Sequence, residues 1–215
     1  MTQILHVDSS SRSSASLTRQ LSRQLVSALQ KAHPQSRLVE RNLIDEPPQF
    51  VSELDISAVY TPAEQRSAAQ SKAWDVINGP LQTFIDSDIY VFGVPMYNFS
   101  VPAVFKAFID LTVIAGRTFA YSADGLKPLL QNKKAYVVTA SGGDYDLPGA
   151  KAMDFVEPYL RAVLGFIGIG DITFIKVPGH SETEIEASKA RALAQIEAIA
   201  AAAASVTHQT ATAGV

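Results

Sequence analysis

The sequence predicts an α/β fold in which helices cover both faces of a parallel sheet of about five strands. Short aliphatic and β-branched runs alternate with longer segments of helical periodicity, about five of each. Hydrophobic residues make up 47% of the 215 residues and charged residues 18%, which is typical of a chain with a packed core. The length favours one large domain over two, so we expect residues 1–215 to form a single domain that ends in a flexible tail over 205–215.

The chain begins with a strand, a serine-rich loop and a helix. Residues 3–8, QILHVD, are an apolar run that ends in polar residues, as a buried strand does where it enters a loop. Leucines recur every four residues from Leu17 to Leu29 and mark one face of a helix that should end near Pro34. Residues 37–43 are expected to form a second strand, followed by a proline-bearing loop.

The middle of the chain predicts an interrupted helix and then a central strand. Thr61-Pro62-Ala63-Glu64 has the spacing of a capping box with proline at the first helical position, which predicts a helix through about Asn78. Gly79-Pro80 should interrupt it before a short helix over 81–86. Residues 88–94 follow, and their continuous apolar character is typical of a parallel strand buried on both faces.

The remaining segments continue the alternation. The helix expected after residue 102 has apolar positions on more than one face, Phe105 and Phe108 among them, which suggests burial against a second subunit as well as the sheet. Residues 116–134 are expected to form a β-hairpin or an ordered excursion that could reach a partner. Strands are then expected at 135–139 and 172–177, and helices at 150–164 and 188–204.

Composition excludes several classes of function. A formal net charge of −3 and a pI near 5.8 give no basic surface for nucleic acid. The chain has no cysteine, which excludes disulfides, thiolate metal sites and cysteine nucleophiles and fits a reducing cytoplasm. Nothing approaches the ~18 consecutive apolar residues of a membrane span, so we expect no membrane association.

The expected sheet selects three loops as the place for chemistry. In an open parallel sheet, ligands bind outside the carboxyl ends of the strands, where the strand order reverses. The loops that follow the first, third and fourth predicted strands, residues 8–18, 95–102 and 140–148, should meet at that edge.

The first of these loops resembles a phosphate cradle without glycines. Six serines between Ser9 and Ser16, followed by Thr18, precede a helix, where free N–H groups and the helix dipole favour an anion, and Arg12 could add a charge. Neither G-x-G-x-x-G nor a nucleoside-triphosphate loop is present, so a monophosphate is preferred over a dinucleotide or ATP. The alternative is a capping loop that binds nothing.

The other two loops supply an apolar platform and close backbone donors. Met96, Tyr97, Asn98 and Phe99 lie between two prolines, where a flat apolar group would fit, although they could simply cap the sheet. The segment 141–143, Ser-Gly-Gly, lets backbone amides approach a ligand closely, although a plain turn is the alternative. Together the three loops describe a flavin mononucleotide (FMN) site.

Other candidate residues carry no predicted chemistry. His6 lies within the first strand and is expected to be a core or subunit-interface residue, while His33, His180 and His208 lack the spacing of metal ligands. We therefore expect no metal site. The sequence contains no G-x-S-x-G motif, so only the serine-rich composition would support a serine hydrolase.

Four segments carry a family resemblance, together with the opening strand and its serine loop. The chain resembles the bacterial FMN-dependent NADH:azoreductases, also called FMN-dependent NADH:quinone oxidoreductases, from residue 3 to about residue 180. The resemblance implies a flavodoxin-like doubly wound fold, one FMN per subunit of a homodimer, and ping-pong transfer of two electrons from NADH or NADPH to quinones and azo compounds. The four segments read PMYNFSVPAVFKAFID, AGRTFAYSADGLKPL, VVTASGGDY and YLRAVLGFIGIGD.

The resemblance also implies roles for particular residues. The flavin carries the hydride, so no catalytic acid or base is required. Phe119 and Tyr121 are candidates to line the substrate pocket from the other subunit. Residues that match the family's FMN-binding positions, in the phosphate loop, along the ring and at its pyrimidine edge, are Ser10, Ser16, Leu17, Thr18, Pro95, Met96, Tyr97, Asn98, Phe99, Ser141, Gly142, Gly143 and Asp144.

Two functions of other classes remain open at this point. A flavodoxin-type carrier would bind the same cofactor and move single electrons between proteins, but such carriers are usually smaller and more acidic. A non-catalytic FMN-binding module is the second alternative. Oxidation of NADH in the presence of a quinone separates both from an enzyme.

Overall fold

The computed structural model contains one five-stranded parallel sheet, as predicted, in the order β2-β1-β3-β6-β7. It describes residues 1–212, with side chains through residue 205. The chain builds outward from β1 to β2 and then returns to the other side of β1, so the strand order reverses between β1 and β3. The strands of this sheet are β1 (Gln3–Asp8), β2 (Arg37–Asn42), β3 (Ile89–Pro95), β6 (Lys134–Ser141) and β7 (Asp171–Pro178).

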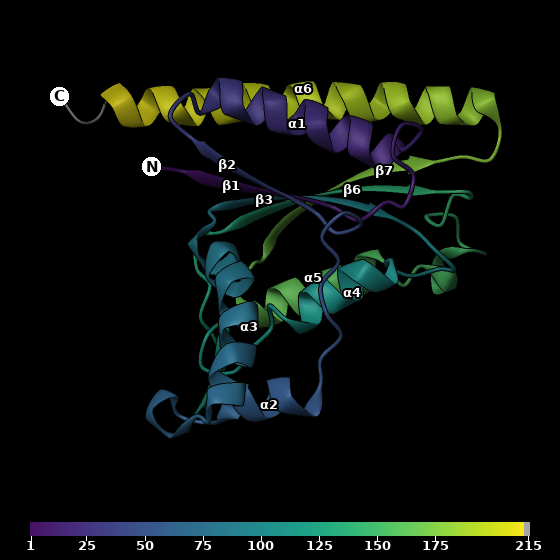
Figure 1. Ribbon diagram of the computed structural model, residues 1–215. Coiled ribbons are helices and arrows are strands. Elements are labelled where there is room, and N and C mark those ends of the chain that lie inside the picture. Colours follow the sequence, from purple (N-terminus) through teal and green to yellow (C-terminus); the bar gives the residue numbers. More distant parts are fainter. Residues whose placement is uncertain (213–215) are drawn as a thin grey trace.

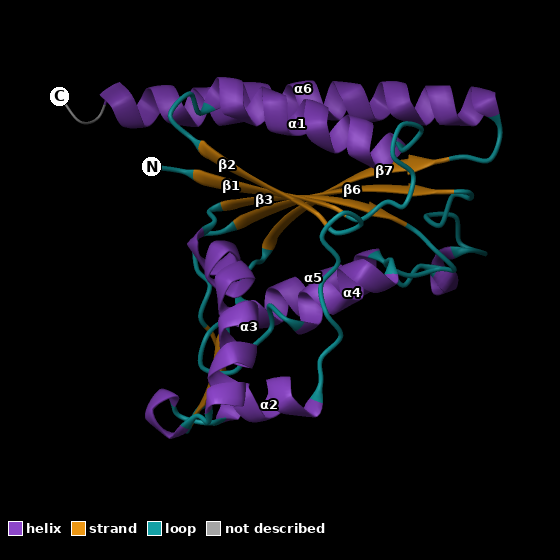
Figure 2. Ribbon diagram, in the orientation of Figure 1, coloured by secondary structure: helices purple, strands orange, loops and turns teal. Residues whose placement is uncertain are grey.

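Helices cover both faces of the sheet (Figures 1 and 2). Helices α1 and α6 lie on one face, and α3, α4 and α5 lie on the other, with α2 beyond α3 and away from the sheet. The predicted flavodoxin-like arrangement is therefore confirmed. The helices are α1 (Leu17–Ala32), α2 (Glu53–Tyr60), α3 (Ala68–Asp86), α4 (Ala103–Asp110), α5 (Glu157–Ile167) and α6 (Glu182–Thr212).

Continuous apolar strands hold the layers together. Val7, Phe92, Val137 and Phe174 are neighbours in register across four strands. All but Phe174, which lies on the edge strand, are fully buried. Burial on both faces explains why these strands read as unbroken apolar runs in the sequence.

The prediction for residues 61–86 is wrong about where the helix begins and about the interruption at Pro80. Ser52 begins an unpredicted helix, α2, through a capping box with Asp55, and Thr61 ends that helix rather than starting one. Ser67 then begins α3 through its own capping box, with Gln70. A short polar sequence with several serine and threonine residues offers more than one plausible cap, and the sequence pattern selected the wrong one.

Pro80 does not interrupt α3, which runs unbroken from Ala68 to Asp86. Proline removes one N–H donor and so leaves the carbonyl four residues earlier, that of Val76, without its helical partner. Val76 is exposed, so water can satisfy that carbonyl. The predicted separate helix over 81–86 is therefore the second half of α3.

Three further boundaries differ from prediction. Helix α5 begins at Glu157 rather than at residue 150, because the Asp154 carboxylate accepts hydrogen bonds from the N–H groups of Val156, just before the helix, and of Glu157, its first residue. Helix α6 begins at Glu182 rather than at Ser188. It continues to Thr212, so the predicted tail over 205–215 is helical up to that residue, and residues 213–215 lie outside the described part of the chain.

The predicted excursion over 116–134 is a β-hairpin. Strands β4 (Phe119–Ser122) and β5 (Gly125–Pro128) pair antiparallel and lie outside the main sheet. Among residues 1–212, no helix combines the length and the apolar character that crossing a bilayer requires.

Candidate functional site

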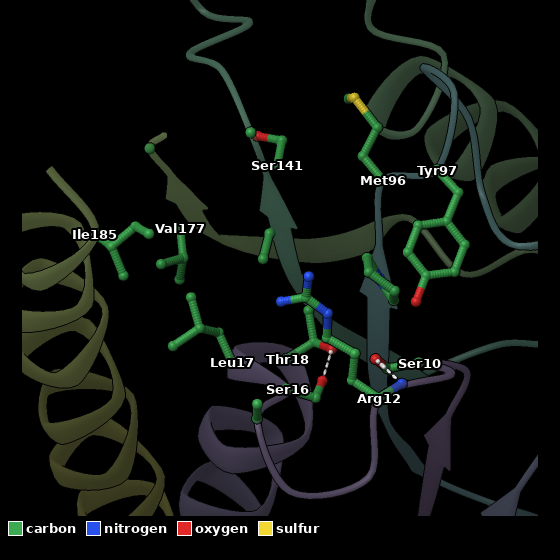
Figure 3. Close-up of a pocket in the computed structure, with 15 residues that line it drawn as sticks. Ser10, Arg12, Ser16, Leu17, Thr18, Met96, Tyr97, Ser141, Val177 and Ile185 are labelled. Atoms are coloured by element: carbon green, nitrogen blue, oxygen red, sulfur yellow. Dashed lines mark hydrogen bonds between the residues drawn. The ribbon is translucent and has the colours of Figure 1, made fainter. Parts of the chain in front are cut away.

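A cavity of about 360 Å³ opens at the carboxyl ends of the strands, where the three predicted loops meet (Figure 3). Its volume falls in the range of small-molecule sites. The β1–α1, β3–α4 and β6–α5 loops all contribute to it, as the sheet topology predicts. The predicted residues that line it are Ser10, Ser16, Leu17, Thr18, Pro95, Met96, Tyr97, Ser141 and Gly142.

Other predicted residues lie outside this cavity within the single chain. Asn98 and Phe99 form the tip of the loop after β3, and Gly143 and Asp144 continue the turn beyond Gly142. Tyr121 is exposed on β4. Phe119, on the same strand, lines a separate cavity of about 140 Å³ beside α2.

The serine loop is tied to the start of α1. The Ser16 side chain caps the helix by accepting a hydrogen bond from the Arg19 N–H, and its hydroxyl lies 3.0 Å from that of Thr18 (Figure 3). Both side chains are buried and line the cavity. Hydroxyls and free N–H groups at a helix N-terminus form an anion-binding arrangement. The Arg12 side chain enters the cavity from the same loop.

Tyr97 joins this loop to the loop after β3. Its hydroxyl accepts a hydrogen bond from the Ser11 N–H at 3.2 Å and lies 3.0 Å from the Ser11 hydroxyl. Partial burial alone would raise the pKa of Tyr97, but hydrogen bonds from Ser11 and Ser10 and the nearby charge of Arg12 outweigh it and lower that pKa. The phenol ring therefore has a fixed position at the wall of the cavity.

A strained turn follows Tyr97. Tyr97 and Ser100 exchange two backbone hydrogen bonds of 2.9 and 3.1 Å, and the two residues between them have positive φ angles, 48° at Asn98 and 71° at Phe99. Two such residues make a type I′ turn, in which glycine is usual at the second position. Phenylalanine in this conformation is an outlier, and such strain is concentrated at functional sites.

The loop after β6 is held from two sides. The Ser141 hydroxyl donates to the Gly143 carbonyl at 2.8 Å, which closes the turn. The loop after β7 adds a bond from the Gly179 N–H to the Ser141 carbonyl at 3.1 Å. The His180 Nδ1 lies 3.1 Å from the Gly142 carbonyl oxygen. No heavy atom lies within 4 Å of the position that a Gly142 Cβ would take, so the backbone is open to a ligand there.

An ion-pair cluster anchors the far end of the same loop. Lys176 on β7 lies 2.6 Å from Asp146 and 2.5 Å from Glu157, the first residue of α5. Burial opposes both charges, yet the hydrogen bonds within the cluster hold the pKa of Glu157 below its ordinary value and that of Lys176 above it. Both groups are therefore charged at neutral pH.

Sequence reasoning did not select six of the lining residues as binding positions, and one of them, Ala15, lies within the serine loop. Arg12 was noted only as a source of charge, and Ala140 precedes the selected turn. Val177 and Gly179 follow from the same rule that selected the other loops, because β7 also ends at this edge. Ile185 lies on α6, which begins earlier than predicted.

The arrangement has the features required for a ligand with an anionic end and a flat apolar part. Hydroxyls, helix N–H groups and Arg12 lie on one side, and Leu17, Met96, Val177 and Ile185 provide apolar walls. Within the described residues, no group of three or more histidine, aspartate or glutamate side chains is arranged to hold a metal ion. His6 is buried with its Nε2 2.9 Å from the Ser22 hydroxyl, which agrees with a core position.

Comparison with known sequences gives two kinds of match. A family model described as a flavodoxin-like fold matches residues 2–200. An FMN-dependent NADH:quinone oxidoreductase from Nostoc punctiforme is 44% identical over 183 residues, which cover 85% of this chain and 89% of the relative. A protein of the same name, numbered 1, from Hahella chejuensis is 47% identical and covers 81% and 84%, respectively.

Solved structures agree with the fold. An azoreductase from Bacillus anthracis str. Sterne superposes with a TM-score of 0.86 at 26% identity, covering 93% of this chain and 99% of the other. An FMN-dependent NADH-azoreductase from Bacillus anthracis str. Ames Ancestor, solved in complex with FMN, gives a TM-score of 0.85 at 21% identity and covers 94% and 100%. The second similarity concerns the fold alone.

Proposed function

This chain belongs to the family of FMN-dependent NADH:quinone oxidoreductases, and we propose that it transfers two electrons from NADH or NADPH to quinones and azo compounds in ping-pong order. The chain is accordingly an FMN-dependent oxidoreductase. The observation that carries the proposal is the cavity at the point where the strand order reverses. In this cavity the hydroxyl-rich N-terminus of α1 lies opposite apolar walls. FMN has a phosphate at one end and a flat ring at the other, so its two parts match the two sides of the cavity.

The serine loop would hold the phosphate. Ser10, Ser16 and Thr18 bring hydroxyls to the cavity, and the N-terminus of α1 adds free N–H groups and the positive end of its dipole. Arg12 would contribute the positive charge that a phosphate dianion favours. Leu17 lies between the two hydroxyl residues and would contribute its backbone N–H together with an apolar wall.

The loops after β3 and β6 would hold the ring. When bound, FMN would supply the hydride-transfer chemistry. Pro95 and Met96 line the cavity beside Tyr97, and the turn with Asn98 and Phe99 would set the position of this segment. The N–H groups of residues 141–144 would face the pyrimidine edge and stabilise the negative charge that reduction places there.

The acceptor pocket would be completed by a second copy of the chain. Apolar side chains are exposed on and before α2, including Phe50 at 77% and Tyr60 at 72%. Exposed apolar patches of this kind mark interaction surfaces. A homodimer would cover them, and Phe119 and Tyr121 would then line the pocket of the partner subunit.

The decisive test is an anaerobic absorbance titration of the FMN-loaded protein with NADH. We expect one equivalent of NADH to bleach the flavin band in one step, and a quinone to restore it. A flavin band that NADH leaves unchanged, but that a one-electron donor alters, would favour a carrier. Failure to retain FMN would refute the assignment of the cavity.

The remaining parts of the proposal need separate measurements. Sedimentation of the wild-type protein and of an Ile56→Glu variant tests the dimer, since a charge on this exposed apolar face should give a monomer. Initial rates with quinones and azo dyes, each with NADH and NADPH, define donor and acceptor. A cytoplasmic location remains our expectation from the cysteine-free sequence.

A further inference from the structure

A buried guanidinium lies behind the serine loop, on the side away from the cavity. Arg19 is in the first turn of α1, and only 5% of its surface is exposed. Its Nε and Nη2 donate to the Ser10 carbonyl at 3.2 and 2.7 Å. The same Nη2 lies 2.7 Å from the side-chain oxygen of Asn42 at the end of β2. A buried arginine with two donors on one carbonyl is unusual, because charged side chains are rarely buried unless paired.

Asp8 provides the charge partner. Its Oδ2 lies 3.5 Å from the Arg19 Nη1, and its Oδ1 accepts from the Ser22 hydroxyl at 3.3 Å. Burial would raise the pKa of Asp8, but the hydrogen bond and charge of His6 and the charges of Arg19 and Arg23 lower it below its ordinary value. The pair is thus ionised, and the Asp8 carboxylate fixes the guanidinium at the end of β1.

Peptide geometry links this pair to the cavity. In a trans peptide the carbonyl and the following N–H point in opposite directions. Because Arg19 holds the Ser10 carbonyl in the interior, the N–H of Ser11 faces outward, where it donates to Tyr97 at the cavity wall. A flipped peptide would instead aim a carbonyl oxygen toward the anion side of the loop, where it would repel a phosphate.

We propose that Arg19, fixed by Asp8, is a positioning residue that sets the Ser10–Ser11 peptide for recognition of the FMN phosphate. This inference rests on the proposed function, because it takes the phosphate to lie on the serine loop. Arg19 does not line the cavity. It acts through the backbone of Ser10, whereas Arg12 would act on the phosphate directly.

The inference predicts a loss of binding affinity only for a flavin that carries a phosphate. Riboflavin has the same ring as FMN but no phosphate, so a misplaced serine loop should weaken FMN binding and leave riboflavin binding unchanged. A general loss of structure would weaken both. The ratio of the two dissociation constants therefore separates positioning from folding.

Two variants test the paired N–H donors of the Arg19 guanidinium and its buried charge. Arg19→Lys keeps the charge but cannot donate twice to one carbonyl in the same plane. Arg19→Met removes the arginine nearest to the buried Asp8 carboxylate, so it is combined with Asp8→Asn to keep the fold. The matched control is Arg23→Met, which removes a cation 3.9 Å from the same carboxylate. The Arg23 side chain is 61% exposed.

Dissociation constants for FMN and riboflavin would be measured by flavin fluorescence quenching, with circular dichroism melts alongside. We expect both variants to bind FMN about tenfold or more weakly, with riboflavin binding and the control unchanged. Variants that keep the wild-type ratio of FMN to riboflavin affinity would overturn the inference and leave the proposed function standing. A wild-type protein that binds riboflavin as tightly as FMN would overturn the placement of the phosphate on the serine loop, and the inference with it.

Discussion

The Tyr97 hydroxyl lies 3.0 Å from the Ser11 hydroxyl and accepts a second hydrogen bond from the Ser11 N–H. Ser11 follows β1 and Tyr97 follows β3, so the contact bridges the two strands between which the sheet order reverses. It joins the loop assigned to the phosphate to the loop assigned to the ring. The contact therefore holds the two loops together at the wall of the cavity.

Loss of this bridge should weaken FMN binding. Tyr97→Phe removes the hydroxyl and keeps the ring, and we expect the FMN dissociation constant to rise about three- to tenfold, as the loss of about 1 kcal/mol of hydrogen bonding implies. Fluorescence titration measures the change. Tyr136→Phe, near the start of β6 and outside the cavity, is the control and should not alter binding. Unchanged affinity in Tyr97→Phe would mean that the two loops are positioned independently.

The turn after Tyr97 should lower the stability of the fold through its strain and favour the binding of FMN. Phe99→Gly should relieve the strain of the positive φ and raise the free energy of unfolding in urea by about 1 kcal/mol. Its FMN affinity should fall, because the phenyl ring of Phe99 is lost. Phe99→Ala removes the same ring but keeps the strain, so it should lose affinity without gaining stability. Equal stability of the two variants would show that the turn carries no strain.

Gly93 should not tolerate a methyl group. A Cβ at this position would lie 2.6 Å from Asp8 Oδ1 and 3.3 Å from the Ser22 hydroxyl, both held in a buried network. We expect Gly93→Ala to cost about 1 to 3 kcal/mol of unfolding free energy. The control is Gly165→Ala on α5, where a Cβ meets nothing within 4 Å and the helix should gain about 0.5 to 1 kcal/mol.

The Lys176 cluster predicts how stability depends on pH. The pKa of Glu157 is lowered in the folded protein, so its contribution is complete above the ordinary value near 4.5 and is lost as pH falls through the folded pKa. The pKa of Lys176 is raised, so its contribution is complete below the ordinary value near 10.5 and is lost as pH rises through the folded pKa. Between these limits the ion pairs are intact.

Lys176→Met tests this dependence. At pH 7 the variant should be less stable than wild type by about 1 to 2 kcal/mol. The difference should shrink below about pH 4 and above about pH 11, which urea unfolding across the range would reveal. A difference that is constant with pH would assign the loss to packing of the lysine stem instead. Lys31→Met, on α1 and away from the cluster, should show no such profile.

The sequence predicts the sheet and its ligand-binding edge well because both depend on simple regularities. Parallel strands buried on both faces are continuous apolar runs, and the rule that ligands bind at their carboxyl ends needs no side-chain detail. Residues 3–8 and 88–94 match β1 and β3 to within a residue at either end, and the loops after them line the cavity.

The rest depends on contacts between distant residues. The polar stretch around Thr61 offers several possible caps, and only packing selects Ser52 and Ser67. Arg19 looks like an ordinary surface residue in the sequence, since the carbonyl and the carboxylate that bury it belong to a folded loop and a strand end. The contribution of Ile185 depends on the start of α6, which lies earlier in the chain than the sequence pattern indicates.

The exposed edge of the sheet has a consequence for behaviour at high concentration. Within residues 1–212, β2 pairs only with β1, so one side of its backbone can recruit a further strand. Arg37, Glu40 and Arg41 give this strand a high density of charge. Charged side chains on an edge strand disfavour pairing with a further strand, so this edge is protected against growth into β-aggregates.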